Sequence, residues 1–378
     1  MVSALAERLV TWYDQHRRFL PWREDPTPYH VWVSEIMLQQ TRVEAVKGYY
    51  TRFLTSLPDV YALAEADEGF LLKLWQGLGY YSRARNLQKA AKQLVQEQQG
   101  QLPDTTEELQ RLPGIGAYTA GAIASIAFGK PVIAPDGNAY RIFSRLQQEE
   151  GFLEDRETKK RLEEAMQSVI DHKRPGAFNQ ALMDLGSLIC LAKGDPLCAQ
   201  CPLHEFCAVA GKEIATQYPK RRPKKPRRKE KKTVLLIQQG DRLLLWQQPK
   251  NGLLAGMWLF PMLNGHLSPE EILMRMSEQG IARGCVQHIK KLDPAIHIFS
   301  HLEWHMIGYL VILTESKYPI LAAVGKDKQQ DTLLTQVEAV QEEMETVPEE
   351  RKMVWANPEE IARHYAIPAA HRPFFVER

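Results

Sequence analysis

A strongly basic tract, KRRPKKPRRKEKK at residues 220–232, divides the chain into two parts with different patterns. Apolar side chains recur at helical spacing before the tract, and strand-like alternation begins only after it. Pro223 and Pro226, together with repulsion between like charges, disfavour a packed element within the tract. We therefore expect one domain at 1–219, a linker at 220–232 and a second domain at 233–378.

The net charge of +2 over 378 residues conceals an uneven distribution. The tract contributes +9, whereas the parts before and after it contribute −3 and −4. Clustered lysine and arginine is typical of contact with nucleic-acid phosphates, and a solvated spacer is the other interpretation. No apolar run approaches the roughly 18 residues of a membrane span. The N-terminus carries charges within its first ten residues and has no small-residue cleavage site, so we expect a cytoplasmic protein.

The first part of the chain shows a series of amphipathic patterns and almost no strand pattern. We therefore expect an all-α domain. Its helices are predicted at 3–18, 30–54 (one or two helices), 67–76, 82–98, 105–112, 117–128, 138–148, 157–171 and 178–189.

The segment RLPGIGAYTAGAIASIAF at 111–128 joins two of these helices through a short turn. Pro113 ends the first helix, and Gly114 and Gly116 permit a tight turn before a helix of small residues. Such a turn directs free N–H groups and the positive end of a helix toward an anion, typically a phosphate. An ordinary helical hairpin is the alternative.

Four of the five cysteines fall within eighteen residues, while the fifth, Cys285, stands apart. In a chain expected in the cytoplasm, such clustering indicates a metal site more than disulfides. Four thiolates suit either zinc or an iron–sulfur cluster, and the spacing does not separate the two. The predicted ligands are Cys190, Cys198, Cys201 and Cys207.

After the tract, the pattern changes to period-two alternation in TVLLIQQ, RLLLWQQ and IHIFSHLEWHMIGYLVIL. Helical patterns remain at 269–279 and 357–364, so the second domain is predicted to be α/β or α+β. Residues 329–350 hold seven acidic residues and no Lys or Arg, which indicates a solvated insertion that does not contact nucleic acid.

Several motifs in the first part resemble one enzyme family. LPGIGAYTAGAIAS resembles the helix–hairpin–helix of base-excision DNA glycosylases related to endonuclease III, and the cysteines resemble the 4Fe–4S loop of that superfamily. LPWR, VWVSEIMLQQTRVE, WQGLGYYSRARNL, DGN and FNQALMDLG resemble the adenine DNA glycosylases of the MutY type. The resemblance covers 1–219 almost continuously. It implies a 4Fe–4S cofactor, a monomer, and duplex DNA with adenine opposite 8-oxoguanine or guanine as the substrate.

Removal of a base from deoxyribose needs an acid for the leaving base and a carboxylate facing the cationic sugar. The resemblance assigns these roles to Glu35 and Asp136. Val31, Trp32 and Leu38 neighbour Glu35 on its predicted helix, and apolar surroundings raise the pKa of a carboxyl group. Asp136 precedes a predicted helix, where a cap is the simplest interpretation and where the helix N-terminus favours the ionised form.

The resemblance implies three further residues at this site. Tyr118 and Asn138 match positions that orient the chemistry, and Arg23 matches the arginine of the adenine pocket. Bifunctional relatives carry a lysine at the position of Tyr118, where its amine forms a Schiff base. We therefore predict base removal without efficient strand cleavage.

The resemblance also implies DNA contacts. Gln40 and Tyr80 match residues inserted into the duplex beside the flipped adenine and the lesion, and Leu38 contributes to that contact or to the core. Gly114 and Gly116 are expected to bind phosphate through their turn. The basic tract is expected to supply much of the non-specific phosphate attraction. Partners at replication or mismatch-repair sites stay open.

In the second part, GLLAGMWLFP at 252–261 resembles the Nudix fold, which makes α+β the expected class. EEILMRMSEQG lacks the R-E-x-x-E-E arrangement of a Nudix metal helix, so we expect a hydrolase fold used for binding. Phe299, Ser300 and His301 match the loop with which the family recognises 8-oxoguanine. A structural role is the other interpretation of these three residues.

The chain departs from the family pattern at two points. Pro135 precedes Asp136 where Val or Leu is common, and seven residues, where six are expected, separate Cys190 from Cys198. Three other functions compete with adenine removal. Tyr118 and the second domain argue against an endonuclease III-like glycosylase/lyase for oxidised pyrimidines, and the missing carboxylates argue against a nucleotide pyrophosphohydrolase. Pro135 alone suggests a catalytically impaired DNA-binding protein with a cluster.

Overall fold

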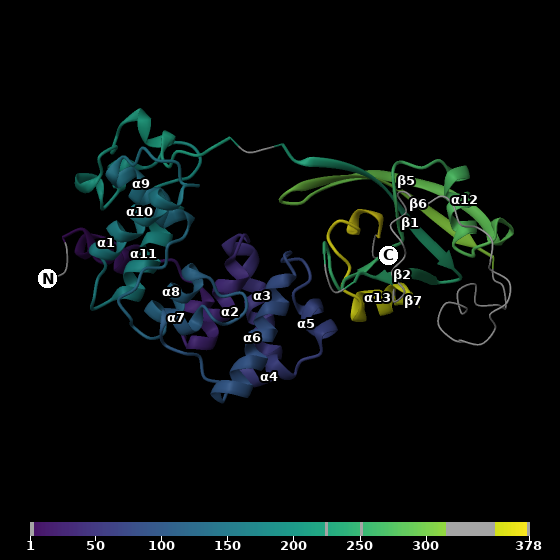
Figure 1. Ribbon diagram of the computed structural model, residues 1–378, viewed down its shortest axis with the longest axis horizontal. Coiled ribbons are helices and arrows are strands. Elements are labelled where there is room, and N and C mark those ends of the chain that lie inside the picture. Colours follow the sequence, from purple (N-terminus) through teal and green to yellow (C-terminus); the bar gives the residue numbers. More distant parts are fainter. Residues whose placement is uncertain (1–3, 224–225, 250–251, 315–351, 376–378) are drawn as a thin grey trace. The chain divides into compact units, whose positions relative to one another are not determined.

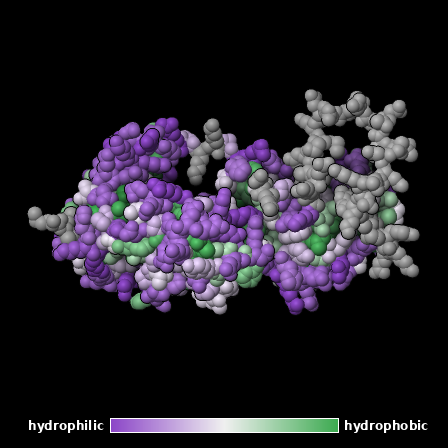
Figure 2. All heavy atoms as spheres, turned by 60° about the horizontal axis from the view of Figure 1, so that its bottom comes forward, coloured by the Kyte–Doolittle hydropathy of each residue, from purple (hydrophilic) through white to green (hydrophobic). Residues whose placement is uncertain are grey.

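The computed structural model describes residues 4–223, 226–249, 252–314 and 352–375. The chain divides into two compact units, one of residues 1–74 and 82–225 and the other of residues 75–81 and 226–378 (Figure 1). On the face shown in Figure 2, the surface is mostly hydrophilic with small hydrophobic patches. The acidic segment predicted at 329–350 lies outside the described residues.

The first unit is built from helices, which confirms the all-α prediction. The segment predicted as one or two helices is two, and one short helix, α4, was not predicted. The α-helices are α1 (Ala4–His16), α2 (Pro28–Leu38), α3 (Val43–Ser56), α4 (Val60–Glu65), α5 (Glu68–Leu74), α6 (Ser82–Gln98), α7 (Thr106–Leu109), α8 (Ala117–Ile126), α9 (Gly137–Gln147), α10 (Arg156–Ser168) and α11 (Pro175–Leu188). Short 3-10 helices are η1 (Pro21–Arg23), η2 (Cys198–Gln200), η3 (His204–Phe206) and η4 (Glu213–Gln217). In the described part of the chain, no helix has both the length and the apolar character needed to cross a membrane.

One apolar core joins the first helix to the last three of the series. Leu9 of α1, Phe143 of α9, Leu162 of α10 and Phe178 of α11 belong to this core and are buried. Helix α8 packs against α11 and also against α2, so it connects this core to α2 (Figure 1). As a result, the residues predicted for catalysis on α2, α8 and α9 come from elements that pack together.

A glycine sets the distance between α8 and the segment that leads into α9. Gly121 lies in the middle of α8 and is buried. A Cβ atom at Gly121 would lie 2.0 Å from the carbonyl oxygen of Ile133. Only glycine allows this approach, and the approach brings the segment ending at Asp136 close to α8.

The second unit is built on a mixed seven-stranded sheet with the order β3-β2-β1-β6-β5, in which β4 pairs with β1 and β7 with β2. Strands β1 and β6 are parallel, and the other pairs are antiparallel. This confirms the α+β prediction. The strands are β1 (Arg228–Gln239), β2 (Arg242–Gln247), β3 (Trp258–Leu259), β4 (Met262–Asn264), β5 (Val286–Ile298), β6 (Leu302–Leu313) and β7 (Met353–Ala356).

Helices cover both faces of this sheet. On one face, Leu235 and Ile237 of β1 share a core with Ile272 of α12 (Pro269–Glu278). The 3-10 helix η5 (Arg283–Cys285) follows α12 and directly precedes β5. On the other face, Val234 and Leu236 share a core with α13 (Pro358–His364) and η6 (Arg372–Phe374). The alternation of β1 therefore buries both of its faces over 233–237.

The predicted linker is wrong in its last five residues, because β1 begins at Arg228. Residues 228–232 pair in parallel with the start of β6. Glu230 compensates the charge of its neighbours, since it forms ion pairs with Arg228 and with Lys232, the latter at 3.2 Å. Main-chain pairing and this single acid outweigh the repulsion that argued against an element here.

The start of the tract is also held by acidic partners. Lys220 forms an ion pair with Glu150, Arg221 approaches Glu154 at 3.5 Å, and Arg222 approaches Asp155 at 2.7 Å. Arg222 also lies over the ring of Phe152 at 5.5 Å. The first three basic residues are therefore neutralised locally by the 149–155 loop of the same unit.

The close approach at Gly121 predicts opposite effects for two Gly→Ala changes. Gly121→Ala should lower the free energy of unfolding by about 1–3 kcal/mol, because its Cβ would clash with backbone. Gly48→Ala, in exposed α3 with only the end of Arg52 nearby, should raise it by about 0.5–1 kcal/mol. Denaturant unfolding of both variants measures this; equal effects would contradict the close packing of α8.

Candidate active site and cysteine loop

A cavity of about 210 Å³ lies within the first unit. Six of the residues predicted for the site line it: Arg23, Glu35, Leu38, Tyr118, Asp136 and Asn138. The other lining residues are Arg18, Leu20, Trp22, Val31, Ser34, Thr41, Val43, Ile126, Gln180, Met183 and Ser187. The structure thus brings together two carboxyl groups, a phenol and an amide that are far apart in the sequence.

Glu35 lies on α2, a helix that is buried along most of its length. Thr27 caps its N-terminus by accepting a hydrogen bond from the His30 N–H at 3.2 Å, and Pro28 begins the helix. Only 3% of Glu35 is exposed. Burial raises the pKa of Glu35 to about 7, against the hydrogen bond from Tyr118 and the charge of Arg23, while Asp136 adds to the increase. The direction predicted from the apolar neighbours is confirmed.

Tyr118, in the first turn of α8, connects two helices in the cavity. Its hydroxyl donates to Oε2 of Glu35 and lies 3.9 Å from the Met183 sulfur of α11. Burial and the nearby carboxyl groups raise the pKa of Tyr118 well above its usual value. The phenol therefore stays protonated and serves as a hydrogen-bond donor to the carboxyl group.

Asp136 caps α9, as one of the predicted interpretations required. Its Oδ1 accepts from the Ala139 N–H and its Oδ2 from the Asn138 amide, both at 2.7 Å. The backbone at Asp136 has the extended φ and ψ of an ordinary cap, so Pro135 does not disturb it. The predicted effect of the helix N-terminus is present, but a larger effect opposes it. Burial raises the pKa of Asp136 and outweighs the hydrogen bonds and the charge of Arg141, which lower it.

Asn138 is held from its other side by Arg141, one turn along α9. Nη2 of Arg141 donates to Oδ1 of Asn138 at 2.9 Å and to the Gly186 carbonyl at 2.8 Å. A Cβ at Gly186 would lie 2.5 Å from the Cβ of Asn138, so only glycine allows α11 to come this close. Gly186 was not predicted; an interior helical glycine within FNQALMDLG was its only signal in the sequence.

A second amide of α11 fixes the chain that leads to Asp136. Asn179 is buried, and its Oδ1 accepts from the Ala134 N–H at 3.0 Å. Its Nδ2 donates to the Val132 carbonyl at 2.9 Å. These bonds hold the segment on both sides of Ile133, and sequence reasoning did not assign Asn179 any role.

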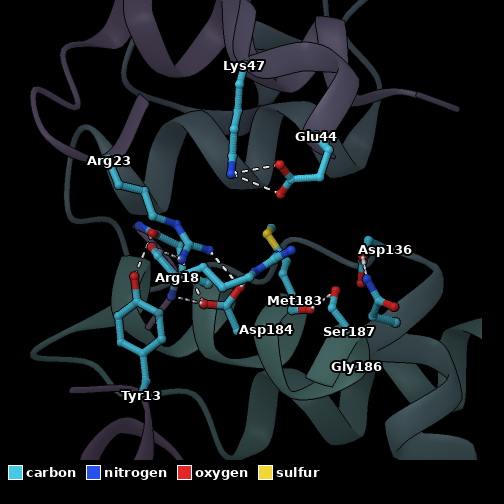
Figure 3. A network of polar contacts seen from close by, with 12 residues as sticks. Tyr13, Arg18, Arg23, Glu44, Lys47, Asp136, Met183, Asp184, Gly186 and Ser187 are labelled. Atoms are coloured by element: carbon cyan, nitrogen blue, oxygen red, sulfur yellow. Dashed lines mark hydrogen bonds and ion pairs between the residues drawn. The ribbon is translucent and has the colours of Figure 1, made fainter. Parts of the chain in front are cut away.

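Arg23 is fixed on the cavity wall by an aspartate that the sequence did not reveal (Figure 3). The side chain of Asp184 on α11 is fully buried, and it accepts two bonds from Arg23, at 2.7 and 3.1 Å. It also accepts from the Arg18 side chain at 2.7 Å. Arg23 further lies 5.5 Å from the centre of the Tyr13 ring. Two arginines share one buried carboxylate, which leaves positive charge at the cavity.

Arg83 of α6 caps the C-terminal end of α2. The Arg83 guanidinium donates to the carbonyls of Ile36 and Met37 at 2.8 and 2.9 Å, and also to the Gln39 carbonyl. Gln40 follows in the left-handed conformation with φ +57° and is exposed. Arg83 thus holds the turn that presents Gln40, and no spacing in the sequence indicated this.

The remaining predicted DNA contacts do not line the cavity. Tyr80, in the segment 75–81, is 44% exposed and has a φ of +48°, a strained conformation for such a residue. Gly114 has a φ of +81° and so requires glycine. Gly116 caps α8 with an extended φ of −95°, and a Cβ there would meet no atom within 4 Å. Its conformation therefore does not demand glycine.

The predicted lesion loop lies at the turn between β5 and β6. The ring of Phe299 packs edge-on against His297 and Trp304, at 4.6 and 4.8 Å between ring centres. Ser300 and His301 are exposed, with 3.3 Å between Oγ and Nδ1. Phe299 therefore anchors the turn, while the next two residues face solvent.

The four predicted cysteine ligands line one further cavity in the first unit, together with Arg145 and His204. All four are free thiols and half-buried, so the additional residue after Cys190 is absorbed by the loop. Arg145 donates to the Cys190 sulfur at 3.1 Å, so a cationic side chain contacts one of the four sulfur atoms. Four thiols on one cavity beside a cation suit a group that takes four thiolates.

Burial raises the pKa of Cys201 to about 12, so near neutral pH this thiol ionises only where a bound cation stabilises the thiolate. Among the described residues, no three His, Cys, Asp or Glu side chains are grouped so as to hold a single metal ion.

In the second unit, the Glu271 side chain of α12 forms a capping box with Ser268.

Comparison with known families matches both units. The family described as HhH-GPD superfamily base excision DNA repair protein matches residues 33–170, and the NUDIX domain family matches residues 233–377.

Comparison with curated proteins finds adenine DNA glycosylases among the relatives of this chain. The chain is 35% identical to the adenine DNA glycosylase of Homo sapiens, over 80% of this chain and 66% of that protein. It is 36% identical to that of Mus musculus, over 83% of this chain and 72% of that protein. It is 32% identical to that of Buchnera aphidicola subsp. Schizaphis graminum, over 83% and 89% of the two chains.

The raised pKa of Glu35 predicts a pH-dependent stability. The pKa of Glu35 rises from 4.5 to about 7 on folding. Below about pH 4.5 the group is protonated in both the folded and the unfolded state, so it does not lower the free energy of unfolding. As the pH rises from there through about 7, the unfolded state loses the proton first and the free energy of unfolding falls. Glu35→Gln should therefore be more stable than the wild type at pH 8, by up to about 3 kcal/mol. Urea unfolding at both pH values tests this, with Glu65→Gln, at an exposed position, as the control. An unchanged difference between pH 4.5 and pH 8 would contradict the buried acid.

Proposed function

Because the chain belongs to the adenine DNA glycosylases, a family of base-excision repair enzymes, we propose that it hydrolyses the bond between adenine and deoxyribose where adenine faces 8-oxoguanine or guanine. The observation that carries this proposal is the burial of Glu35 in the same cavity as Asp136. A carboxyl group with a pKa of about 7 is half protonated at neutral pH, which suits a general acid.

In this proposal Glu35 protonates the departing adenine and Asp136 faces the cationic sugar. Protonation makes the base a better leaving group, while the carboxylate stabilises or traps the oxocarbenium ion. Once adenine has left, Glu35 holds the negative charge and can take a proton from water as it attacks the sugar. Tyr118 supports both stages, since its hydroxyl is bonded to Glu35 and orients it.

Asp136 is prepared for its role by the hydrogen bonds from Ala139 and Asn138. These bonds and the charge of Arg141 favour the ionised form against the cost of burial. Arg23 contributes a fixed positive charge at the same cavity, where it is proposed to bind the flipped adenine. Flipping a base from the duplex costs a few kcal/mol, and we assign this work to exposed residues.

Those residues are Gln40 and Tyr80, which we propose enter the duplex, while Leu38 lines the cavity. Exposure and a left-handed backbone at Gln40 and Tyr80 support this assignment, because strained residues cluster at functional sites. The turn of Gly114 and Gly116 would bind phosphate through free N–H groups at the start of α8. Phe299, Ser300 and His301 would contact 8-oxoguanine.

We propose that the enzyme removes the base without cleaving the strand. The position at which a lysine would form a Schiff base holds Tyr118, whose phenol stays protonated. The cationic residues on the cavity wall are Arg18 and Arg23, and guanidinium groups do not lose a proton to become nucleophiles. We also propose a monomer in the bacterial cytoplasm.

We propose that Cys190, Cys198, Cys201 and Cys207 hold a 4Fe–4S cluster. When bound, such a cluster would supply the positive charge that lets buried thiols ionise, and the four cysteines would tie the 190–207 loop to it. Arg145 would remain bonded to the Cys190 sulfur and to the Leu191 carbonyl at 2.9 Å.

The first test is excision from a duplex with adenine opposite 8-oxoguanine. Strand breaks should appear only after alkali treatment, and the single-turnover rate should fall as the pH rises through about 7, because Glu35 must be protonated. Glu35→Gln should abolish excision and retain DNA binding. Breaks without alkali would indicate a lyase, and full activity of Glu35→Gln would disprove the acid assignment.

The second test concerns the cofactor. Purified protein should be brown and contain about four iron atoms per chain, following the composition of such clusters. Cys201→Ser should lose iron, whereas Cys285→Ser, which changes the cysteine of the second unit, should retain it. A colourless protein that contains zinc would overturn the assignment.

A further inference from the structure

Three strands of the second unit extend beyond the layer that α12 covers. Strand β1 is buried on both faces over 233–237, but Lys229 and Lys231, on the face that α12 covers further along, are exposed. The register places Glu303 and His305 of β6 beside these lysines. Figure 1 shows β1, β5 and β6 running side by side over this length.

The edge strand β5 completes this face with two isoleucines. Ile298 pairs with Glu303 and Ile296 with His305, so both isoleucines lie on the side of the sheet that carries the lysines. They are 56% and 62% exposed. We call the six residues Lys229, Lys231, Glu303, His305, Ile296 and Ile298 the open sheet face.

The lysines of the open sheet face keep their charge available. Glu303 is the acid beside them, and it already lies 3.7 Å from Arg227 and 3.4 Å from His305. Glu230, on the opposite side of β1, is occupied by its own neighbours. Within the described part of the chain, no ion pair involves Lys229 or Lys231. By contrast, the first three basic residues of the tract are paired with the 149–155 loop.

The isoleucines also indicate a partner. Proteins normally protect an edge strand with charges, prolines or a cover, because exposed apolar strands aggregate. Here two large apolar side chains remain exposed on β5, directly before the turn of Phe299, Ser300 and His301. A surface that combines cations with apolar groups is complementary to a nucleic-acid backbone, which offers phosphates and sugar carbons together.

We propose that the open sheet face binds the backbone of duplex DNA beside the lesion. Lys229 and Lys231 would contact consecutive phosphates, and Ile296 and Ile298 would pack against the adjoining deoxyriboses. This inference rests on the proposed function, because it assumes that the neighbouring β5–β6 turn meets the lesion. It also assigns different roles to the two ends of the basic tract. The lysines on β1 would bind phosphate, whereas the basic residues at 220–222 form ion pairs with acidic residues of the 149–155 loop.

The test is the salt dependence of binding by the full chain. The probe is a duplex with a stable abasic analogue opposite 8-oxoguanine, titrated at several salt concentrations. Lys229→Ser/Lys231→Ser should reduce the slope of log K against log salt by about 1.8, since each phosphate contact contributes about 0.9. Between about 50 and 200 mM salt, the wild type should then lose about twelvefold more affinity than this variant.

The chain offers a matched control on the same sheet. Lys290 and Lys291 are exposed on β5, beyond the irregularity between Leu292 and Ala295. Lys290→Ser/Lys291→Ser removes the same charge from the same unit and should leave the slope unchanged. Ile296→Ser/Ile298→Ser should weaken binding at every salt concentration with the wild-type slope.

The outcomes separate this inference from the proposed function. If the wild type excises adenine but both lysine variants change the slope equally, or neither changes it, the open sheet face does not bind DNA. If Ile296→Ser/Ile298→Ser leaves DNA binding intact and instead dissociates a dimer, the face joins two copies of the chain. If the wild type excises no adenine, the proposed function itself fails.

Discussion

The removal of Glu35 from water is the constraint on which the rest of the cavity depends. A carboxyl group on a buried helix is tolerated only if it is protonated or hydrogen-bonded, and Glu35 meets both conditions through its raised pKa and Tyr118. Tyr118 reaches Glu35 because α8 packs on α2, and Gly121 lets the same helix approach the segment before α9. Arg83 then satisfies the last carbonyls of α2.

Helix α9 places the second carboxyl group and also connects it to the cysteine loop. Asp136 caps the helix, and Asn138, Arg141 and Arg145 follow along it. Arg141 donates to Asn138 at one end and to the Cys190 carbonyl, at 2.9 Å, at the other. Arg145 reaches the Cys190 sulfur from the next turn. The loop that carries the four cysteines therefore shares one helix and one set of hydrogen bonds with Asp136.

Local patterns predicted the helices, the strands and the direction of the pKa shift at Glu35, because these depend on neighbours along the chain. They did not predict contacts between distant elements. Asp184, which is buried between Arg18 and Arg23, and Gly186, which admits Asn138, have no local signal that sets them apart. The linker was overextended for the same reason, since the stability of β1 from Arg228 onward comes from pairing with β6, some seventy residues away.

The opposing effects at Asp136 explain how two carboxyl groups in one cavity can differ in role. The helix terminus alone suggested ionisation, but burial raises the pKa of both groups. The difference lies in their hydrogen bonds: Asp136 receives the Ala139 N–H and the Asn138 amide, whereas Glu35 receives the Tyr118 hydroxyl. Donors to the carboxylate favour its ionised form, so the pair loses its first proton mainly from Asp136. The resulting charge raises the pKa of Glu35 further and favours its protonated form, which is the difference that the proposed roles of acid and carboxylate require.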